Sequence, residues 1–142
     1  MPDIEELHKV VRQWIRKAED DFDAAGRLLK SGPGCPCDPV CFHAQQCVEK
    51  YLKSMLVLRA IPFPKTHNLT VLAALIPVSV RPNLSPEEER ALTRYATVFR
   101  YPGDCDATVP AEARAAFRVA RRVRNEARRA LRRELPRADQ QT

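Results

Sequence analysis

Four polar side chains recur along a stretch that is otherwise rich in apolar residues. The stretch is CFHAQQCVEKYLKSML, residues 41–56, and the side chains are His43, Gln46, Lys50 and Lys53. Ammonium and amide groups beside an imidazole can hold a phosphate or a carboxylate, and an imidazole can also transfer a proton. On a helix the four residues lie within roughly 80° of one another, opposite the apolar face. They form either a solvent-exposed face or a binding face.

Two later segments carry groups that could complete such a site. PKTHN supplies Lys65 and His67 just past the end of this helix, and RYPGD supplies Arg100 and Tyr101. Cations, an imidazole and an aromatic ring together suit the phosphate and base of a nucleotide or of RNA. Tyr101 precedes a proline, which holds its backbone extended. The spacing leaves open whether these groups meet the polar residues of the helix.

The cysteines indicate neither a disulfide framework nor a metal site. There are five of them, and no secretory signal precedes them. The cluster Cys35, Cys37 and Cys41 has an unusual spacing for zinc, and only His43 and Cys105 are further candidate ligands. We therefore predict no metal and no cofactor.

Helical periodicity and strong punctuation predict five helical segments that must position these residues. Apolar residues recur every three or four positions from Ile4 to Leu29, up to the SGPGCPCDP loop. Asp38 is the expected N-cap of the second helix, which runs to about Ala60. The other three are expected at LTVLAALI with Thr66 or Asn68 as cap, after Ser85 and Pro86, and from Pro110 to about Leu135.

These segments predict an all-α fold, an up-and-down bundle of four to five helices. No segment alternates in the manner of a strand, and no Gly-rich phosphate loop occurs. Residues 1–136 form the expected single domain, followed by a flexible tail over residues 137–142. A bundle of this size commonly leaves part of an apolar stripe uncovered, which favours a homodimer.

The net charge of +6 comes from the last segment. Residues 111–142 hold ten arginines and four acidic residues, whereas the charges of residues 1–110 balance. A ridge of arginines at helical spacing could attract RNA or an acidic partner. Glu112, Glu126 and Glu134 could dilute this ridge by pairing with arginines one turn away. The ridge would consist of Arg114, Arg118, Arg121, Arg128 and Arg132.

Nothing in the sequence predicts a membrane protein. No apolar run approaches the roughly 20 residues that span a bilayer, and the start MPDIEELHKV is acidic and polar. We expect a soluble protein of the cytoplasm.

The motifs together resemble a known family. CFHAQQCVEKYLKSML is followed by PKTHNL and then by LTRYATVFRYPG, and WIRKAEDDFDAAGRLL precedes all three. This order is similar to that of the HEPN family, named for higher eukaryotes and prokaryotes nucleotide-binding, over about residues 10–130. The FHAQQ and RYPG motifs resemble one branch of that family.

The resemblance implies a helical bundle that is usually a homodimer. Such proteins are often encoded beside a small nucleotidyltransferase, and some of these pairs act as toxin–antitoxin modules. Many members of the wider family are metal-independent ribonucleases with an arginine followed four to six residues later by a histidine. Here the histidines are His8, His43 and His67, and none of them follows Arg100. The sequence therefore departs from the ribonuclease pattern.

Three hypotheses follow. The first is a non-catalytic nucleotide-binding or partner module that acts with a nucleotidyltransferase. The second is a ribonuclease toxin with a rearranged site, in which Arg100 works with His43 or His67. The third is binding of RNA or of an acidic partner by the Arg-rich last helix.

Overall fold

The structure, a computed structural model, describes residues 3–96 and 108–136. This part of the chain contains three long helices and two short ones. The helices are α1 (Ile4–Lys30), α2 (Cys37–Leu58), α3 (Leu69–Leu75), α4 (Pro86–Tyr95) and α5 (Pro110–Glu134). No strand occurs in these described residues, which confirms the all-α prediction.

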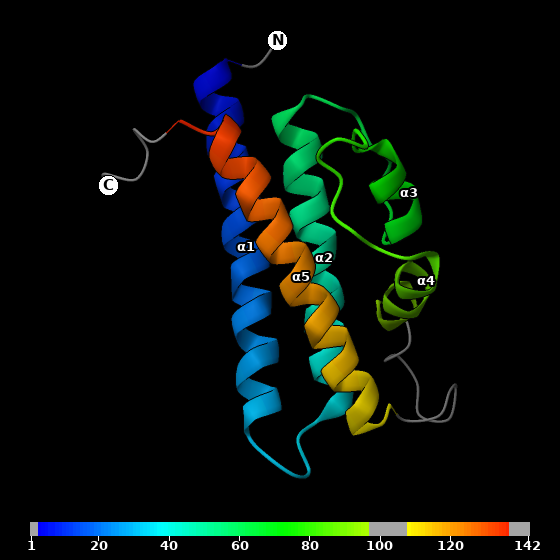
Figure 1. Cartoon of the computed structure of the whole chain (residues 1–142). Helices are drawn as coiled ribbons and strands as arrows, with labels where there is room; N and C mark the ends of the chain where they lie inside the picture. Colours follow the sequence, from blue (N-terminus) through cyan, green and yellow to red (C-terminus); the bar gives the residue numbers. More distant parts are fainter. Residues whose placement is uncertain (1–2, 97–107, 137–142) are drawn as a thin grey trace.

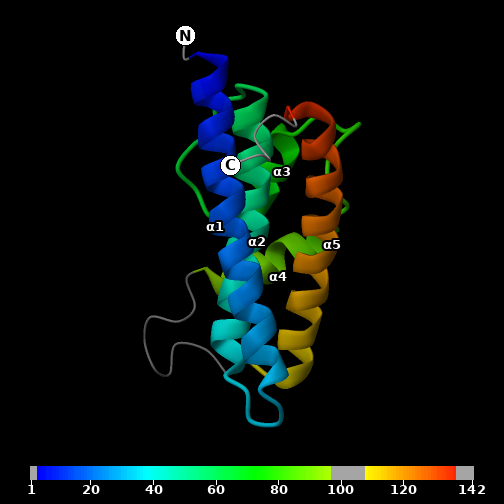
Figure 2. The same cartoon turned by 90° about the vertical axis from the view of Figure 1, so that its left-hand side faces the viewer.

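The long helices lie roughly along one axis, with α1 antiparallel to both α2 and α5 (Figure 1). In Figure 1, α1 descends, α2 ascends beside it, and α5 ascends across the front of both. The short helices α3 and α4 lie on the other side of α2 from α1, and together they return the chain to the start of α5. Figure 2 shows α1 in front of α2, with α5 as a separate column beside them. The arrangement is an up-and-down bundle in which two short helices replace one long one.

The ends of the short helices follow from local chemistry. The Asn68 side chain accepts hydrogen bonds from the backbone N–H groups of Thr70 and Val71, which makes it the N-cap of α3. Ser85 and Glu88 form a reciprocal capping box at the start of α4, with Pro86 in the first turn. The sequence predicted both starts.

The start of α2 differs from the prediction. Asp38 lies inside the first turn, and the N-cap position belongs to Pro36. The carboxylate of Asp38 instead accepts hydrogen bonds from the backbone N–H and the hydroxyl of Thr108. The prediction of Asp38 as the cap was wrong because a tertiary contact with the segment before α5 takes its carboxylate.

Helix α2 is the centre of the molecule. It packs against all four other helices, most extensively against α1 and then against α5. The buried surface of α2 therefore extends around most of the helix, and residues such as Tyr51, Leu52 and Met55 are fully buried. By contrast, α1 and α5 make few contacts with each other. The bundle is thus closed around α2 and more open between α1 and α5.

Within the described residues, no helix combines the length and the apolar character that crossing a membrane requires.

Candidate functional site

The polar stripe of α2 is not a solvent-exposed face. Lys53 is buried, and His43, Gln46 and Lys50 are only partly exposed. The helical wheel placed these residues opposite the core, and that interpretation was wrong because α1 packs against the same side of α2. The stripe therefore lines a seam between helices.

Asp21 of α1 holds one end of the stripe. Its Oδ1 lies 2.9 Å from Nδ1 of His43, and its Oδ2 accepts a hydrogen bond of 2.6 Å from Nζ of Lys50. The side chain of Asp21 is 11% exposed and that of His43 31% exposed. The sequence contained a signal for this role, because Asp21 is an acidic residue on the apolar stripe that includes Ala18 and Ala25. Asp21 was not among the predicted site residues.

Glu49 organises the other end of the stripe. Its carboxylate accepts hydrogen bonds from Gln45 (2.9 Å) and Lys53 (3.1 Å) and lies 2.8 Å from Nδ1 of His67. Gln46 extends the network by donating to the side-chain oxygen of Gln45 at 2.6 Å. Burial opposes ionisation of Glu49, but the three hydrogen bonds and the charge of Lys53 outweigh it and lower its pKa. The network joins the segment before α3 to the middle of α2.

The carboxylates determine what the two imidazoles can do. With Asp21 and Glu49 at Nδ1, both rings favour the tautomer that carries its proton on Nδ1. The Nε2 atom then acts as an acceptor or as a base. Either ring can therefore bind a donor group or accept a proton, and carboxylate-oriented histidines do both in proteins.

The structure brings together five of the eight predicted site residues. His43 and Lys50 meet at Asp21, and Lys53, His67 and, through Gln45, Gln46 meet at Glu49. Lys65 is exposed and joins neither group. Arg100 and Tyr101 lie outside the described residues.

A third polar cluster, on the other side of the α1–α2 pair, was not predicted. Glu19 of α1 accepts a hydrogen bond from the hydroxyl of Tyr51 (2.7 Å) and two from Arg124 of α5 (2.6 and 2.8 Å), and it also pairs with Arg128. Burial opposes ionisation of Glu19, yet the hydrogen bonds from Arg124 and Tyr51 and the nearby positive charges lower its pKa. Glu19 thus ties the three long helices together.

This cluster also corrects the expected pairing within the last helix. The glutamates of α5 were predicted to pair with arginines one turn away. The contacts that the structure shows run between elements instead: Arg124 and Arg128 with Glu19, Arg122 with Glu88, Glu134 with Arg59, Glu112 with the Tyr95 hydroxyl, and Glu126 with the Asn83 backbone N–H. The paired side chains of α5 thus contact other elements of the bundle and not residues one turn away on the same helix.

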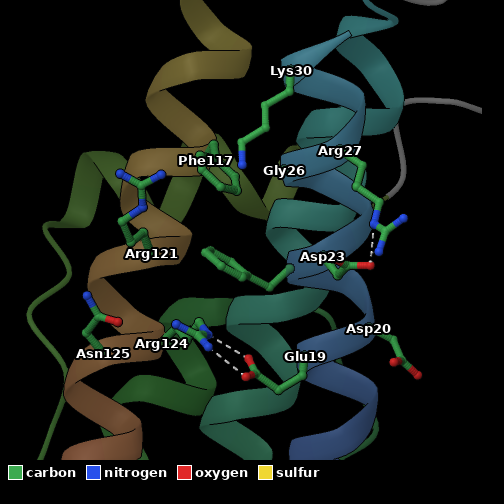
Figure 3. A pocket seen from close by; sticks show the side chains of 11 residues that line it. Glu19, Asp20, Asp23, Gly26, Arg27, Lys30, Phe117, Arg121, Arg124 and Asn125 are labelled. Atoms are coloured by element: carbon green, nitrogen blue, oxygen red, sulfur yellow. Dashed lines mark hydrogen bonds and ion pairs between the residues drawn. The ribbon is translucent and has the colours of Figure 1, made fainter.

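A groove of about 630 Å³ lies beside Glu19, between α1 and α5 (Figure 3). The rings of Phe22 and Phe117 stack within it, with centroids 5.0 Å apart and planes inclined by 15°. Lys30 extends toward Phe117 from the end of α1, and Arg121 flanks the same ring from α5. A second hollow of about 290 Å³ continues along α5 and is lined by Arg124, Asn125, Arg128, Arg129 and Arg132.

Cys35, Cys37, Cys41 and Cys47 are free thiols. Among all the residues that the structure describes, no group of three or more His, Cys, Asp or Glu side chains could hold a metal ion. Cys37 donates a hydrogen bond to the backbone oxygen of Cys35, whereas Cys41 is buried. Cys105 lies outside the described residues.

Comparisons with known proteins agree with this architecture. A family model described as "HEPN domain" matches residues 11–130. A curated relative, "Putative toxin MJ1304" of Methanocaldococcus jannaschii, is 44% identical over 55 residues, which cover 39% of this chain and 34% of that protein. The chain thus matches about a third of the relative's length.

Two solved structures share the fold. TT1696 from Thermus thermophilus superposes with a TM-score of 0.69 at 24% identity, covering 84% of this chain and 96% of that one. ST0689, described as an archaeal HEPN homologue, gives a TM-score of 0.56 at 24% identity, with 83% and 94% covered. The branch with FHAQQ and RYPG motifs stays a prediction. The matched residues span most of the bundle, and the chain belongs to the HEPN domain family.

Proposed function

We propose that this chain is the HEPN component of a toxin–antitoxin-like pair and that it acts as a non-catalytic nucleotide-binding or partner module of a small nucleotidyltransferase. Membership of the family and the similarity to a protein named as a toxin support the toxin–antitoxin setting. The cytoplasm stays its predicted compartment.

One observation carries the non-catalytic role. In the part of the chain that the structure describes, the side-chain hydrogen-bond partners of His43 and His67 are the carboxylates of Asp21 and Glu49. The 142 residues also contain no arginine followed four to six residues later by a histidine. These imidazole–carboxylate contacts support a role in which His43 and His67 join elements of the bundle and orient a binding seam.

The proposed ligand surface is the outer edge of this seam. His43 keeps an exposed fraction of 31%, and Lys50 keeps 22%. Gln46 lies between them along α2 and is also partly exposed. An imidazole nitrogen, an amide and an ammonium in one row can bind the phosphate or base edge of a nucleotide. The predicted residues Lys53, Lys65, His67, Arg100 and Tyr101 complete the candidate set.

Titration with ATP and GTP tests the nucleotide part. We expect NMR shifts at the His43 ring and the Gln46 side-chain amide, and weaker binding in Gln46→Ala. Lys17→Gln, an exposed change on α1, serves as the control. Absence of shifts at millimolar nucleotide would contradict nucleotide binding and leave the partner role.

Co-expression with a nucleotidyltransferase encoded beside the gene tests the partner part. We expect the two proteins to co-purify and to remain together at physiological ionic strength. Separate elution in size-exclusion chromatography would contradict the partnership.

An RNA cleavage assay without metal distinguishes the ribonuclease hypothesis. We expect no cleavage above that of a His43→Gln/His67→Gln/Arg100→Gln variant. Cleavage that this variant loses and that His8→Gln keeps would establish the rearranged Arg/His site instead.

The homodimer also stays a prediction. Val71, Leu75 and Val78 are exposed apolar side chains on α3 and the turn after it, and they support an uncovered apolar stripe. Light scattering coupled to size-exclusion chromatography measures the mass directly, and a monomer at micromolar concentration would contradict the dimer.

A further inference from the structure

The groove between α1 and α5 has its own chemistry, separate from the seam on α2. It forms because both helices pack on α2 while making few contacts with each other. Glu19 and Arg124 bridge its middle, and the stacked rings of Phe22 and Phe117 line it nearer the end of α1 (Figure 3). Gly26 lies against Phe117, because a Cβ added there would be 3.4 Å from the end of that ring.

Two cation–ring contacts accompany the stacked rings of the groove. The guanidinium of Arg124 lies 4.6 Å from the Phe22 ring centroid, and the guanidinium of Arg121 lies 4.9 Å from that of Phe117. The two rings also stack on each other, so each ring of the pair contacts one cation. A guanidinium that lies over a ring still presents its N–H edge in the plane, where it can bind a carboxylate with two hydrogen bonds.

Glu19 shows that arginines of this groove bind carboxylates in this way. Two nitrogens of Arg124 donate to the two oxygens of Glu19, at 2.6 and 2.8 Å. Arg128 contributes to the same carboxylate. Arg124 and Arg128 thereby share one carboxylate, which offsets one of their two charges within the molecule.

Other cations along the groove have no such carboxylate. Among the described residues, Lys30, Arg121, Arg129 and Arg132 make no ion pair. The three arginines span eleven helical steps of α5, from Arg121 to Arg132, or about 16 Å. The hollow around Arg129 and Arg132 contains no acidic side chain in its lining. A partner with several carboxylates would balance this charge.

The α1 side of the groove favours a protein over a nucleic acid. Asp20 and Asp23 lie on its α1 side, together with the paired Arg27 (Figure 3). A polyphosphate chain would bring negative charge past both aspartates. A protein segment can place carboxylates on the arginines and an apolar side chain on Phe117. Arginine and aromatic residues are also the types enriched at the centres of protein interfaces.

We propose that the α1–α5 groove is the docking surface for an acidic segment of a partner protein. Carboxylates of the segment bind Arg121, Arg129 and Arg132, and an apolar side chain of the segment packs against Phe117. The proposal rests on the proposed function only in that the chain has a protein partner. Its test uses no nucleotidyltransferase, so either proposal can fail without the other.

The experiment titrates a synthetic helical peptide of about fifteen residues, with glutamates and leucines on one face, against the full chain. We expect saturable binding with NMR shifts at the Phe22 and Phe117 rings and at Nε–H of Arg121. A peptide with glutamine in place of each glutamate is expected to bind at least about tenfold more weakly.

Matched triple variants separate the groove from general basic charge. Arg121→Gln/Arg129→Gln/Arg132→Gln is expected to weaken acidic-peptide binding at least about tenfold. Arg114→Gln/Arg118→Gln/Arg133→Gln removes the same charge from exposed positions of α5 outside the groove lining and is expected to leave binding nearly unchanged.

Three outcomes would overturn the proposal. The first is no binding of the acidic peptide, and the second is equal loss in both triple variants. The third is tighter binding of a single-stranded RNA or DNA of the same charge, with shifts at the same rings, which would make the groove a nucleic-acid site.

Discussion

Nζ of Lys53 lies 3.1 Å from Oε2 of Glu49, one turn earlier on α2, and both side chains are almost fully buried. Lys53 is also close to two aromatic rings, with its nitrogen 5.6 Å from the centroid of Trp14 and 5.9 Å from that of Phe63. An ammonium is tolerated there because a carboxylate and two ring faces surround it. Lys53 and Glu49 therefore stabilise the bundle only as a pair.

Glu49→Gln is expected to lower the free energy of unfolding by about 2–4 kcal/mol, because it leaves the Lys53 ammonium buried without a carboxylate. Urea unfolding followed by circular dichroism measures the change. Glu87→Gln is the control, since its pair with Arg90 is 3.7 Å long and exposed, and its effect should stay within about 0.5 kcal/mol. Equal effects of the two changes would contradict the buried role.

Stability is expected to fall in acid. The folded-state pKa values of Glu19 and Glu49 lie below the ordinary 4.5. Their contribution is therefore complete above about pH 4.5 and is lost as the pH falls through the lowered values. Urea midpoints measured from pH 6 down to about pH 3 should decrease mainly below 4.5, and Glu49→Gln should flatten this decrease. A midpoint that is constant over the range would argue against both lowered pKa values.

Asp21→Asn is expected to destabilise the chain by about 2 kcal/mol or more, because Lys50 and His43 lose the carboxylate that they share. The His43 ring should also lose its fixed tautomer, which nitrogen-15 NMR of the imidazole detects. Asp23→Asn lies two residues away, in an exposed pair with Arg27, and should change neither measurement appreciably.

Gly26→Ala is expected to stabilise the chain by about 0.5–1 kcal/mol, because alanine favours the helix more than glycine does. The new methyl group would meet Phe117 at 3.4 Å, which is an ordinary contact. Thermal unfolding measures the gain. A lower melting temperature would mean that Phe117 cannot accept the methyl group.

The cysteines should differ in reactivity. Burial raises the pKa of Cys41 to about 11, and it raises that of Cys47 further, so both thiols stay protonated at pH 8. In a Cys105→Ser background, we expect iodoacetamide to modify Cys35 first and Cys41 and Cys47 only after denaturation, as read by mass spectrometry. Rapid native labelling of Cys47 would contradict its burial.

Local signals in the sequence were sufficient for much of the fold. Asn68 and Ser85 mark helix starts because their side chains accept hydrogen bonds from backbone N–H groups of the first turn. Pro110 marks a start because it has no N–H group that needs an acceptor, and all three starts are confirmed. Asp38 shows the limit of such reasoning, because its carboxylate bonds Thr108, which is 70 residues away. A cap residue is predictable only when no tertiary partner competes for it.

By itself, the sequence determined the helices, their amphipathic character, the family and the concentration of arginines in the last segment. Only the tertiary structure decided which charges meet: Asp21 with His43 across 22 residues, and Glu19 with Arg124 across 105. Periodicity reports the face of a helix but not the neighbour that covers it. That neighbour is set by the packing of α1 and α5 around α2, and this packing placed the polar face of α2 in a seam between helices.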